Sequence, residues 1–578
     1  MFERRFLFLL MLTLVAVAAA PAQAKEGSDD PKWCRACHTS SVLSEESMAG
    51  GVHADLSCRD CHQGYHFNPH EKVEVVDTDE TKAFKKLGYR SPVAMAACTE
   101  CHDTLSDVPG FSAHGRATDP SDALPYCLDC HGDPHTIKAM GSLTANERKL
   151  AQNERCLGCH DNAVKMEGTG LSTDIRAPYQ HTVHARKLAL GDDKAPGCVD
   201  CHGGHETLTG DAEVESTCGK CHEDANSTFL SISGHPPHTK QAHPISYWTL
   251  KFFAVLTFAT ILALILHVLL DLLATIRAAI RTRTKEEEEE ERKKFGEKGL
   301  NPHKEVQRFD LHQRLQHFIM IASFITLVLT GWPISTSGIG VSHGLVAALG
   351  GLGVVALLHR IAGIGLIVTS VYHLCYLGFL FATKRKAMPL SMLPAPKDVK
   401  DVIHNVLFFF GLKKDRPRYG RFSYFEKFDY WAVFWGVVIM VGSGLIRWFP
   451  VITTKVAPAW VYEIAYIAHA DEAILAALAI FVWHFYNVHL RPAVFPMSWV
   501  FIHGRMSMEE MDLEHGAVFD KMLAENVAKL SVEADNVAID ADVSEDEEEI
   551  ASSDEDNDGE PQSGDSDSDD IDDADRAS

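Results

Sequence analysis

Seven C-x-x-C-H motifs lie in the first 222 residues, and they limit the possible folds of this chain more than any other feature. They use fourteen of its fifteen cysteines. One C-x-x-C pair fits a disulfide, a redox dithiol or half of a zinc site, but a histidine directly after all seven pairs is typical of covalent haem c attachment. The thiols bond to the haem vinyl groups, and the histidine ligates the iron from the proximal side. The motif residues are Cys34, Cys37 and His38; Cys58, Cys61 and His62; Cys98, Cys101 and His102; Cys127, Cys130 and His131; Cys156, Cys159 and His160; Cys198, Cys201 and His202; and Cys218, Cys221 and His222.

Seven motifs share only about 222 residues, which leaves too few residues per motif for an ordinary hydrophobic core. We therefore expect residues 25–246 to form a loop-rich multihaem cytochrome c domain in which seven haem c groups are wrapped by short helices and loops. No C-x-x-C-K variant, of the kind that marks a catalytic haem in nitrite-reducing multihaem enzymes, is present. Ligation of each iron by two histidines favours low-potential electron transfer. Eleven further histidines could close the seven distal positions, and for each of them a surface or propionate-pairing role is the alternative. Six lie within a short loop of a motif and are the preferred distal ligands: His53, His66, His114, His135, His184 and His205.

The first 24 residues predict a secretory signal peptide. Arg4 and Arg5 precede an apolar run, and Ala22-Gln23-Ala24 fits a small-x-small cleavage site. An uncleaved anchor helix is the alternative. In both cases residues 25–246 are exported.

The net charge of −25 arises mostly from the end of the chain. From Glu533 onward there are 21 acidic residues and one arginine, so we expect residues 511–578 to include a disordered acidic tail. A solubilising tail is the preferred interpretation, and a docking site for a basic partner is the alternative. Nothing in the chain indicates nucleic-acid binding.

Five apolar segments are candidate membrane spans, at about residues 247–273, 317–332, 352–381, 430–448 and 465–490. The second is short unless residues 311–316 enter the membrane interface. Lysine and arginine are frequent in alternate loops and nearly absent from the others. The positive-inside rule then places the haem c domain in the periplasm and the tail in the cytoplasm, with the bundle in the inner membrane in contact with lipid. The fold class is therefore mostly α, with a loop-rich domain joined to a helical membrane bundle.

Histidines inside these segments are candidates for a functional site, because polar side chains at membrane depth are costly. Topology puts His359 and His469 near the periplasm, and His317 and His484 near the cytoplasm. Each pair joins two helices and could hold one haem b. His373 shares a face with His359 and competes for the cytoplasmic haem, whereas His489 lies on the opposite face from His469.

The sequence around these histidines resembles the cytochrome b subunits of formate dehydrogenase N and nickel–iron hydrogenase. The motifs that carry the resemblance are Arg314-x-x-His317-Phe318 with Thr330-Gly331-Trp332-Pro333, His359-Arg360-x-x-Gly363, Gly442-x-Gly444-x-x-Arg447-Trp448, and His469 followed by His484-Phe485-Tyr486. In that family four such histidines hold two b haems, and a menaquinone site lies at the cytoplasmic side. This chain departs from the family by a 15-residue step from His469 to His484, where 14 is usual, and by the additional His373.

The resemblance also implies a quinone site just before the fourth span. There Glu426 would take the proton, and Tyr424 or Lys427 would hydrogen-bond the quinone carbonyl. An aromatic belt with snorkelling charges is the alternative interpretation.

The complete arrangement is similar to cytochrome b/c fusions of the CbcL type. It implies menaquinol oxidation, with electrons passing through two b haems and seven c haems to periplasmic c-type cytochromes. The alternatives are a quinone reductase fed by periplasmic hydrogenase or formate dehydrogenase, and a non-enzymatic anchor subunit of a larger complex. The expected domains are 1–24, 25–246, 247–300 (a span with a charged linker), 301–510 (the diheme cytochrome b) and 511–578.

Overall fold

A computed structural model describes residues 45–49, 51–61, 98, 101–102, 127–205, 208, 211–236, 239–280, 301–383, 390–492 and 494–525. The chain divides into two compact units, which are described separately below. Unit 1 comprises Met1–Leu269, Leu315–Thr383 and Trp431–Met497; unit 2 comprises Leu270–Arg314, Lys384–Tyr430 and Ser498–Ser578. The predicted signal peptide, the first motif (Cys34, Cys37 and His38), His62, His66, His114 and the tail beyond residue 525 lie outside the described residues.

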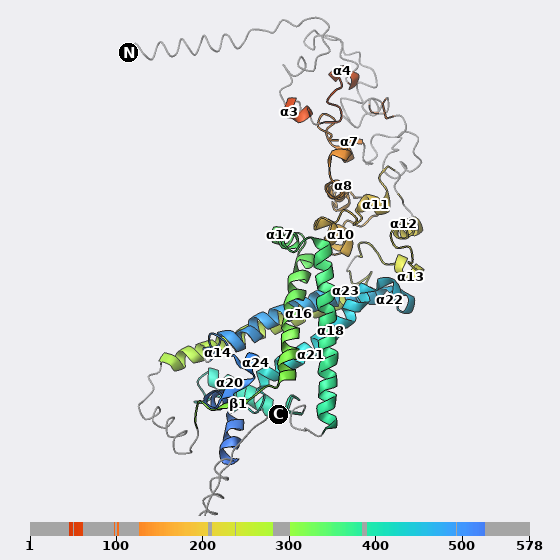
Figure 1. The fold of residues 1–578 in the computed structure, drawn as a ribbon. Helices are drawn as coiled ribbons and strands as arrows, with labels where there is room; N and C mark the ends of the chain where they lie inside the picture. Colours follow the sequence, from red (N-terminus) through yellow and green to blue (C-terminus); the bar gives the residue numbers. More distant parts are fainter. Residues whose placement is uncertain are drawn as a thin grey trace, which may run out of the picture. The chain divides into compact units, whose positions relative to one another are not determined.

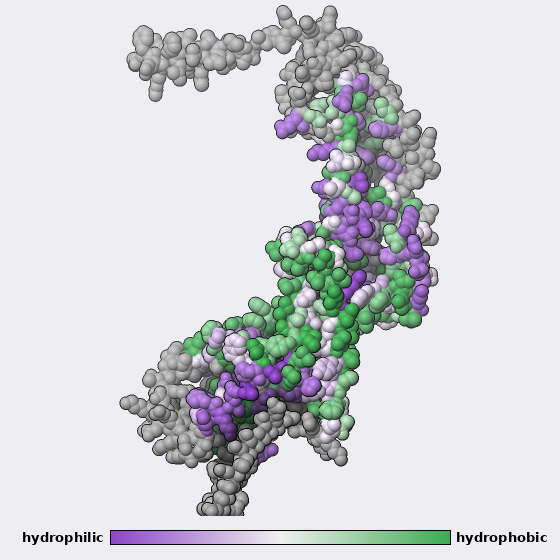
Figure 2. All heavy atoms as spheres, viewed as in Figure 1, coloured by the Kyte–Doolittle hydropathy of each residue, from purple (hydrophilic) through white to green (hydrophobic). Residues whose placement is uncertain are grey.

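Among the residues that the structure describes, five helices are long and apolar enough to cross a membrane, which confirms the predicted class (Figure 1). They are α14 (Pro244–Ile280), α16 (Leu311–Ser335), α18 (Leu352–Ala382), α21 (Tyr424–Trp448) and α23 (Ala459–Ala479), which continues as the π-helical turns η6 (Ile480–His484) and η7 (Tyr486–Leu490). Figure 2 shows hydrophobic residues over the visible faces of these helices. Phe258, Phe381 and Phe481 are each more than 70% exposed, as expected of side chains that face lipid.

Short helices joined by loops make up the described part of the motif-bearing segment, as the sequence predicts. They are α3 (Glu45–Met48), α4 (Cys58–Cys61), α7 (Cys127–His131), η5 (Met140–Ser142), α8 (Ala145–His160), α9 (Arg176–Gln180), α10 (Val183–Ala189), α11 (Cys198–His202), α12 (Asp211–Cys218) and α13 (Ser227–Leu230). Helix α8 is the longest of them and begins at a capping box formed by Thr144 and Glu147. The fourth and sixth motifs coincide with α7 and α11, and the fifth lies at the end of α8, so the cysteines and histidine of these three project from one short helical turn. The cysteines of the second motif bound α4, and the seventh begins at the last residue of α12.

A small apolar cluster in unit 1 joins this segment to the membrane helices. Leu190, at the end of α10, packs with Val346 of α17 (Gly340–Ala348) and with Val355 of α18. Val355 is fully buried, and Ile334, Leu349 and Leu352 pack around the cluster. Helix α10 is therefore fixed against the end of the bundle that precedes α18. Helix α22 (Pro450–Val456) also lies in this unit and contacts α13.

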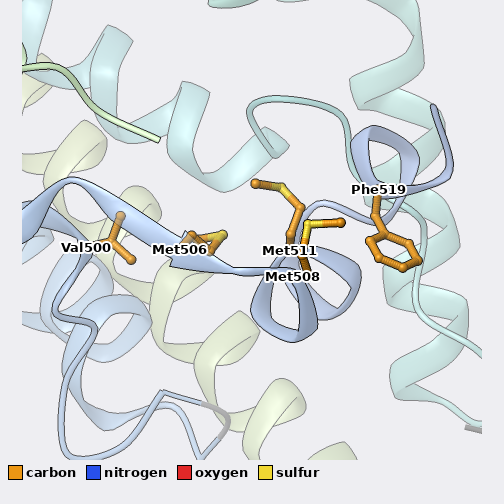
Figure 3. Close-up of a cluster of buried hydrophobic side chains, with 5 residues drawn as sticks. All are labelled: Val500, Met506, Met508, Met511 and Phe519. Carbon is orange, nitrogen blue, oxygen red and sulfur yellow. The ribbon is translucent and has the colours of Figure 1, made fainter. Parts of the chain in front are cut away.

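Unit 2 has its own core around a two-stranded antiparallel sheet. Strand β1 (Glu305–Gln307) pairs with β2 (Arg505–Ser507), with Val306 opposite Met506. Helices α20 (Pro396–Phe409), α24 (Val500–His503) and α25 (Met508–Glu514) complete it. Figure 3 shows its buried side chains, which are Val500, Met506, Met508, Met511 and Phe519. Residues 511–525, which the sequence analysis assigns to the tail region, belong to this core, and Arg418 fixes them by ion pairs to Asp512 and Asp520.

Candidate haem sites

The structure brings the four expected membrane histidines together as two pairs. The ring centroids of His359 and His469 lie 6.4 Å apart, and those of His317 and His484 also lie 6.4 Å apart. A histidine nitrogen bonds a metal at about 2.0–2.1 Å, so two imidazoles on opposite sides of one metal ion have centroids about 6.3 Å apart. Both pairs therefore fit an iron between the rings, and each pair joins two different helices.

Hydroxyl groups orient both rings of the outer pair, His359 and His469. Thr330 Oγ1 donates to the carbonyl oxygen of Thr326 at 2.6 Å and lies 2.8 Å from His359 Nδ1. Ser443 Oγ donates to the carbonyl oxygen of Ile439 at 2.6 Å and lies 3.0 Å from His469 Nδ1. Because each hydroxyl proton is used by a helix carbonyl, each oxygen accepts the Nδ1–H of its histidine. This fixes the tautomer whose Nε2 lone pair is available to a metal.

A glycine follows each of these hydroxyl residues and leaves room for the imidazole. A Cβ on Gly331 would lie 3.2 Å from His359 Cε1, and a Cβ on Gly444 would lie 3.2 Å from His469 Cε1. Helix α16 thus supports the ring carried by α18, and α21 supports the ring carried by α23 in the same way. The Thr330-Gly331 and Ser443-Gly444 dipeptides are visible in the sequence, but their supporting role follows only from the fold.

The inner pair, His317 and His484, has different surroundings. His484 ends the π-helical turn η6, and η7 follows it directly. In a regular α-helix the 15-residue step from His469 would rotate His484 by about 60°. A π turn has more residues per turn and accommodates the additional residue, which accounts for the departure from 14.

His373 lies beside the inner pair and hydrogen-bonds a neighbouring side chain. Its Nδ1 lies 2.8 Å from the Oε1 atom of Gln316, the residue before His317. The His489 ring contacts Phe485 at 4.4 Å, and the His267 ring contacts Trp483 at 4.7 Å. These contacts give each of the three histidines a protein partner in the bundle.

Comparison with known families bears on this part of the chain. Residues 308–494 match the family model described as prokaryotic cytochrome b561. The match supports a cytochrome b here. Its range includes all four histidines of the two pairs, and b haem and membrane electron transfer are the chemistry of that family. No curated protein matches the chain.

Outside the cytochrome b segment, four motif histidines face a second imidazole. The centroid distances are 6.4 Å for His102 and His53, 5.9 Å for His131 and His205, 6.3 Å for His222 and His184, and 6.0 Å for His202 and His235. These values are close to the spacing of the cytochrome b pairs. Three of the preferred histidines, His53, His184 and His205, therefore each face a motif histidine.

His135 and His235 have contacts that the sequence does not indicate. The structure places His135 Nδ1 2.7 Å from Asp133 Oδ1, while His235, which was not among the six preferred residues, faces His202. Proximity in sequence is the signal behind the six preferred residues, and it does not indicate which motif a histidine faces. His205 follows the sixth motif by three residues yet faces His131 of the fourth, because a histidine directly after a motif starts on the proximal side of that haem.

The electrostatics of these histidines favour ligation. Burial lowers the pKa of His131, His184 and His202, which keeps the imidazoles neutral. A neutral ring is the form that binds a metal. His53 Nδ1 lies 3.0 Å from the carbonyl oxygen of Pro134, which fixes the tautomer with Nε2 available.

The three residues expected at the quinone site have protein partners in unit 2. Glu426 accepts from Arg308 Nη2 at 3.0 Å and from Ser423 Oγ at 2.7 Å. Lys427 Nζ lies 2.8 Å from Asp398 Oδ2, and the Tyr424 hydroxyl accepts from Asn405 Nδ2 at 2.8 Å. These contacts stabilise the first turn of α21, so a structural role is established for each residue and the quinone role stays a prediction.

A buried histidine extends the Glu426 contacts. His515 is 3% exposed, its Nε2 lies 4.0 Å from Glu426 Oε1, and its Nδ1 donates to the carbonyl oxygen of Gly420. Nothing in the sequence near His515 indicates this position, because it depends on how residues 498–525 fold against the segment before α21.

Proposed function

We propose that this protein is a membrane-bound, quinol-oxidising electron-transfer cytochrome. Menaquinol is its reductant, and the electrons pass through the cytochrome b segment and the seven C-x-x-C-H motifs to periplasmic c-type cytochromes. The observation that carries the proposal is the recurrence of one spacing: two histidine pairs in the bundle and four in the motif-bearing segment all have centroids 5.9–6.4 Å apart.

The ligand assignments follow from this spacing. His317 and His484 hold one haem b, and His359 and His469 hold the other. Haem iron ligated by two imidazoles supplies one-electron chemistry and has no open position for substrate. The function is therefore electron transfer, and the chemical step on a substrate takes place at the quinol.

Oxidation of one quinol breaks two O–H bonds and releases two electrons and two protons. The protons need an acceptor at the cytoplasmic side, and we assign this role to Glu426. Arg308 offsets the charge of its carboxylate, while His515 provides a neighbouring titratable group. Tyr424 and Lys427 position Glu426 by fixing the start of α21 and are available to hydrogen-bond the quinone.

The membrane topology assigns the two sides. The motif-bearing segment lies in the periplasm, the acidic tail lies in the cytoplasm, and the bundle spans the inner membrane. Residues 1–24 direct export. This assignment rests on the distribution of lysine and arginine between the loops.

The decisive experiment mixes the purified full-length chain, oxidised and anaerobic, with a reduced menaquinol analogue. We expect the b bands to become reduced first and the c bands to follow. Glu426→Gln should slow the reduction, while Glu509→Gln, which changes an exposed carboxylate of α25, should not. Absence of haem reduction by the quinol at any rate would contradict the proposal. Reduction of quinone by the pre-reduced protein alone would instead favour the reverse direction, and copurification with a hydrogenase or dehydrogenase subunit would favour an anchor role.

A further inference from the structure

Consecutive motifs lie against one another along the described part of the motif-bearing segment. The ring of His53 faces His102 of the third motif, and its Nδ1 lies 3.0 Å from the carbonyl oxygen of Pro134, just after the fourth motif. The backbone N–H of Cys198 in the sixth motif donates to Asn153 Oδ1 of α8, the helix that carries the fifth motif, at 2.7 Å. These contacts join the third motif to the fourth and the fifth to the sixth.

The remaining junctions show the same order. His53 also joins the second motif to the third, because it lies five residues before Cys58 and its ring centroid is 6.4 Å from that of His102. Arg155, directly before the fifth motif, donates to the carbonyl oxygen of Cys130 in the fourth at 2.6 Å. Helix α11, which is the sixth motif, contacts α12, which ends at Cys218 of the seventh. Each described motif from the second to the seventh therefore lies beside its neighbour in sequence.

This order has a direct chemical meaning. In c-type attachment the cysteine sulfurs bond to the vinyl edge of the porphyrin. Motifs that lie together would therefore hold their haems next to each other. Packing supports the arrangement, because α8 contacts α11, and α11 contacts α12.

The seventh motif is also the one tied to the membrane bundle. Helix α10 carries His184, which faces His222 of that motif at 6.3 Å. The same helix places the Arg186 guanidinium 5.4 Å from the ring centroid of Tyr466, and Leu190 follows it into the cluster with Val346 and Val355.

Tyr466 connects this contact to the outer histidine pair. It lies three residues before His469 on α23, and its hydroxyl donates to the carbonyl oxygen of His181. On its other side the guanidinium of Arg447 lies 4.6 Å from the ring centroid. Two cations at one aromatic ring favour an anionic group nearby, such as the carboxylates of a porphyrin.

We infer that the second to the seventh C-x-x-C-H motifs form one line in chain order, with the seventh motif beside the His359–His469 pair. Helix α10 and Tyr466 form the junction between the two cytochrome segments, and an external c-type cytochrome exchanges electrons near the N-terminal motifs. The direction of flow along this line rests on the proposed function, whereas the order itself does not.

The test compares full-length variants that each lack one attachment site. Cys218→Ser with Cys221→Ser removes the seventh site, and Cys58→Ser with Cys61→Ser removes the second as the matched control. Potentiometric titration of the b bands needs no quinol. We expect loss of the seventh site to shift the midpoint of the outer b haem and loss of the second to leave it unchanged. Equal effects of the two variants would overturn the inferred order.

Two further measurements separate failure of the order from failure of the proposed function. With the menaquinol analogue, the variant without the seventh site should reduce its b haem while its c haems stay oxidised until dithionite is added. Wild-type rates of c reduction in that variant would contradict the order, and absence of b reduction in the wild type would contradict only the quinol role. If the double-cysteine variant does not fold, His184→Met keeps the haem attached, raises the potential of one c haem and should still shift the outer b midpoint.

Discussion

The outer and inner histidine pairs of the cytochrome b segment share one spacing but are built differently. At the outer pair two helices each present a hydroxyl and a glycine to the ring on a neighbouring helix, so both imidazoles are fixed in orientation and tautomer. At the inner pair, π-helical turns carry His484, and a Gln316–His373 hydrogen bond lies beside His317. The same distance between two imidazole rings can therefore be reached by rigid support of the rings or by local adjustment of the helix winding.

This difference agrees with the roles we propose. The outer pair adjoins the junction with the seventh motif, where fixed geometry keeps the distance between redox centres constant. The inner pair serves the quinol step, and π turns are frequent at functional sites. Four predictions would break or sharpen the comparison.

Removal of a proposed ligand should have the largest effect. His469→Ala should remove the outer b haem and His484→Ala the inner one, because a single remaining imidazole leaves the iron half-ligated. The pyridine haemochrome spectrum should show less b haem and unchanged c haem in both variants. With the quinol analogue, His469→Ala should keep an inner haem that is reduced without passing electrons on. A variant with full b-haem content would contradict the assignment of that histidine.

A change in the length of α23 should separate the two pairs. Deletion of Phe481, which is 73% exposed, gives a 14-residue step and allows the π turn to become regular helix. The rotation of His484 from His469 is then about 40° in a regular helix, so the inner b haem should be retained. Insertion of an alanine after Phe481 should remove it. The outer b haem should survive both changes. If the deletion variant also loses the inner b haem, the π turn has a purpose other than accommodating the additional residue.

The sequence predicts much of this architecture because the strongest signals are local. The length of each span, the spacing within each motif and the charges of the loops can all be read from short stretches of chain. The five helices could therefore be predicted. The His317–His484 and His359–His469 pairs follow from the depth of each histidine in the membrane and from helical phase. The orienting role of Thr330 and Ser443 was missed, because it depends on which helices are neighbours. The partnership of His235 with His202 was missed for the same reason. The 15-residue step is visible in the sequence as a departure, but only the fold reveals that a π turn accommodates it.

Loss of one orienting hydroxyl should have a smaller effect than loss of a ligand. Ser443→Ala and Thr330→Val remove the acceptor of an Nδ1–H, and partners of this kind typically contribute about 10–100-fold in metal affinity. We expect weaker retention of the outer b haem during detergent washes, with the inner haem unchanged. Thr369→Val is the matched control, because Thr369 is a buried threonine that donates to the carbonyl oxygen of Gly365. Equal haem loss in the control would attribute the effect to helix packing.

The smallest effect on cofactor content is expected from His373→Leu. Its Nδ1 hydrogen-bonds Gln316, which is 7% exposed, so the substitution leaves a buried amide oxygen without this partner. An unsatisfied buried polar atom typically costs about 1–3 kcal/mol, and the melting temperature should fall accordingly. The b-haem content should stay at the wild-type level, since His317 faces His484. If His373→Leu loses the inner b haem and His484→Ala retains it, the inner ligand is His373 and not His484. The π turn would then be a feature of packing alone.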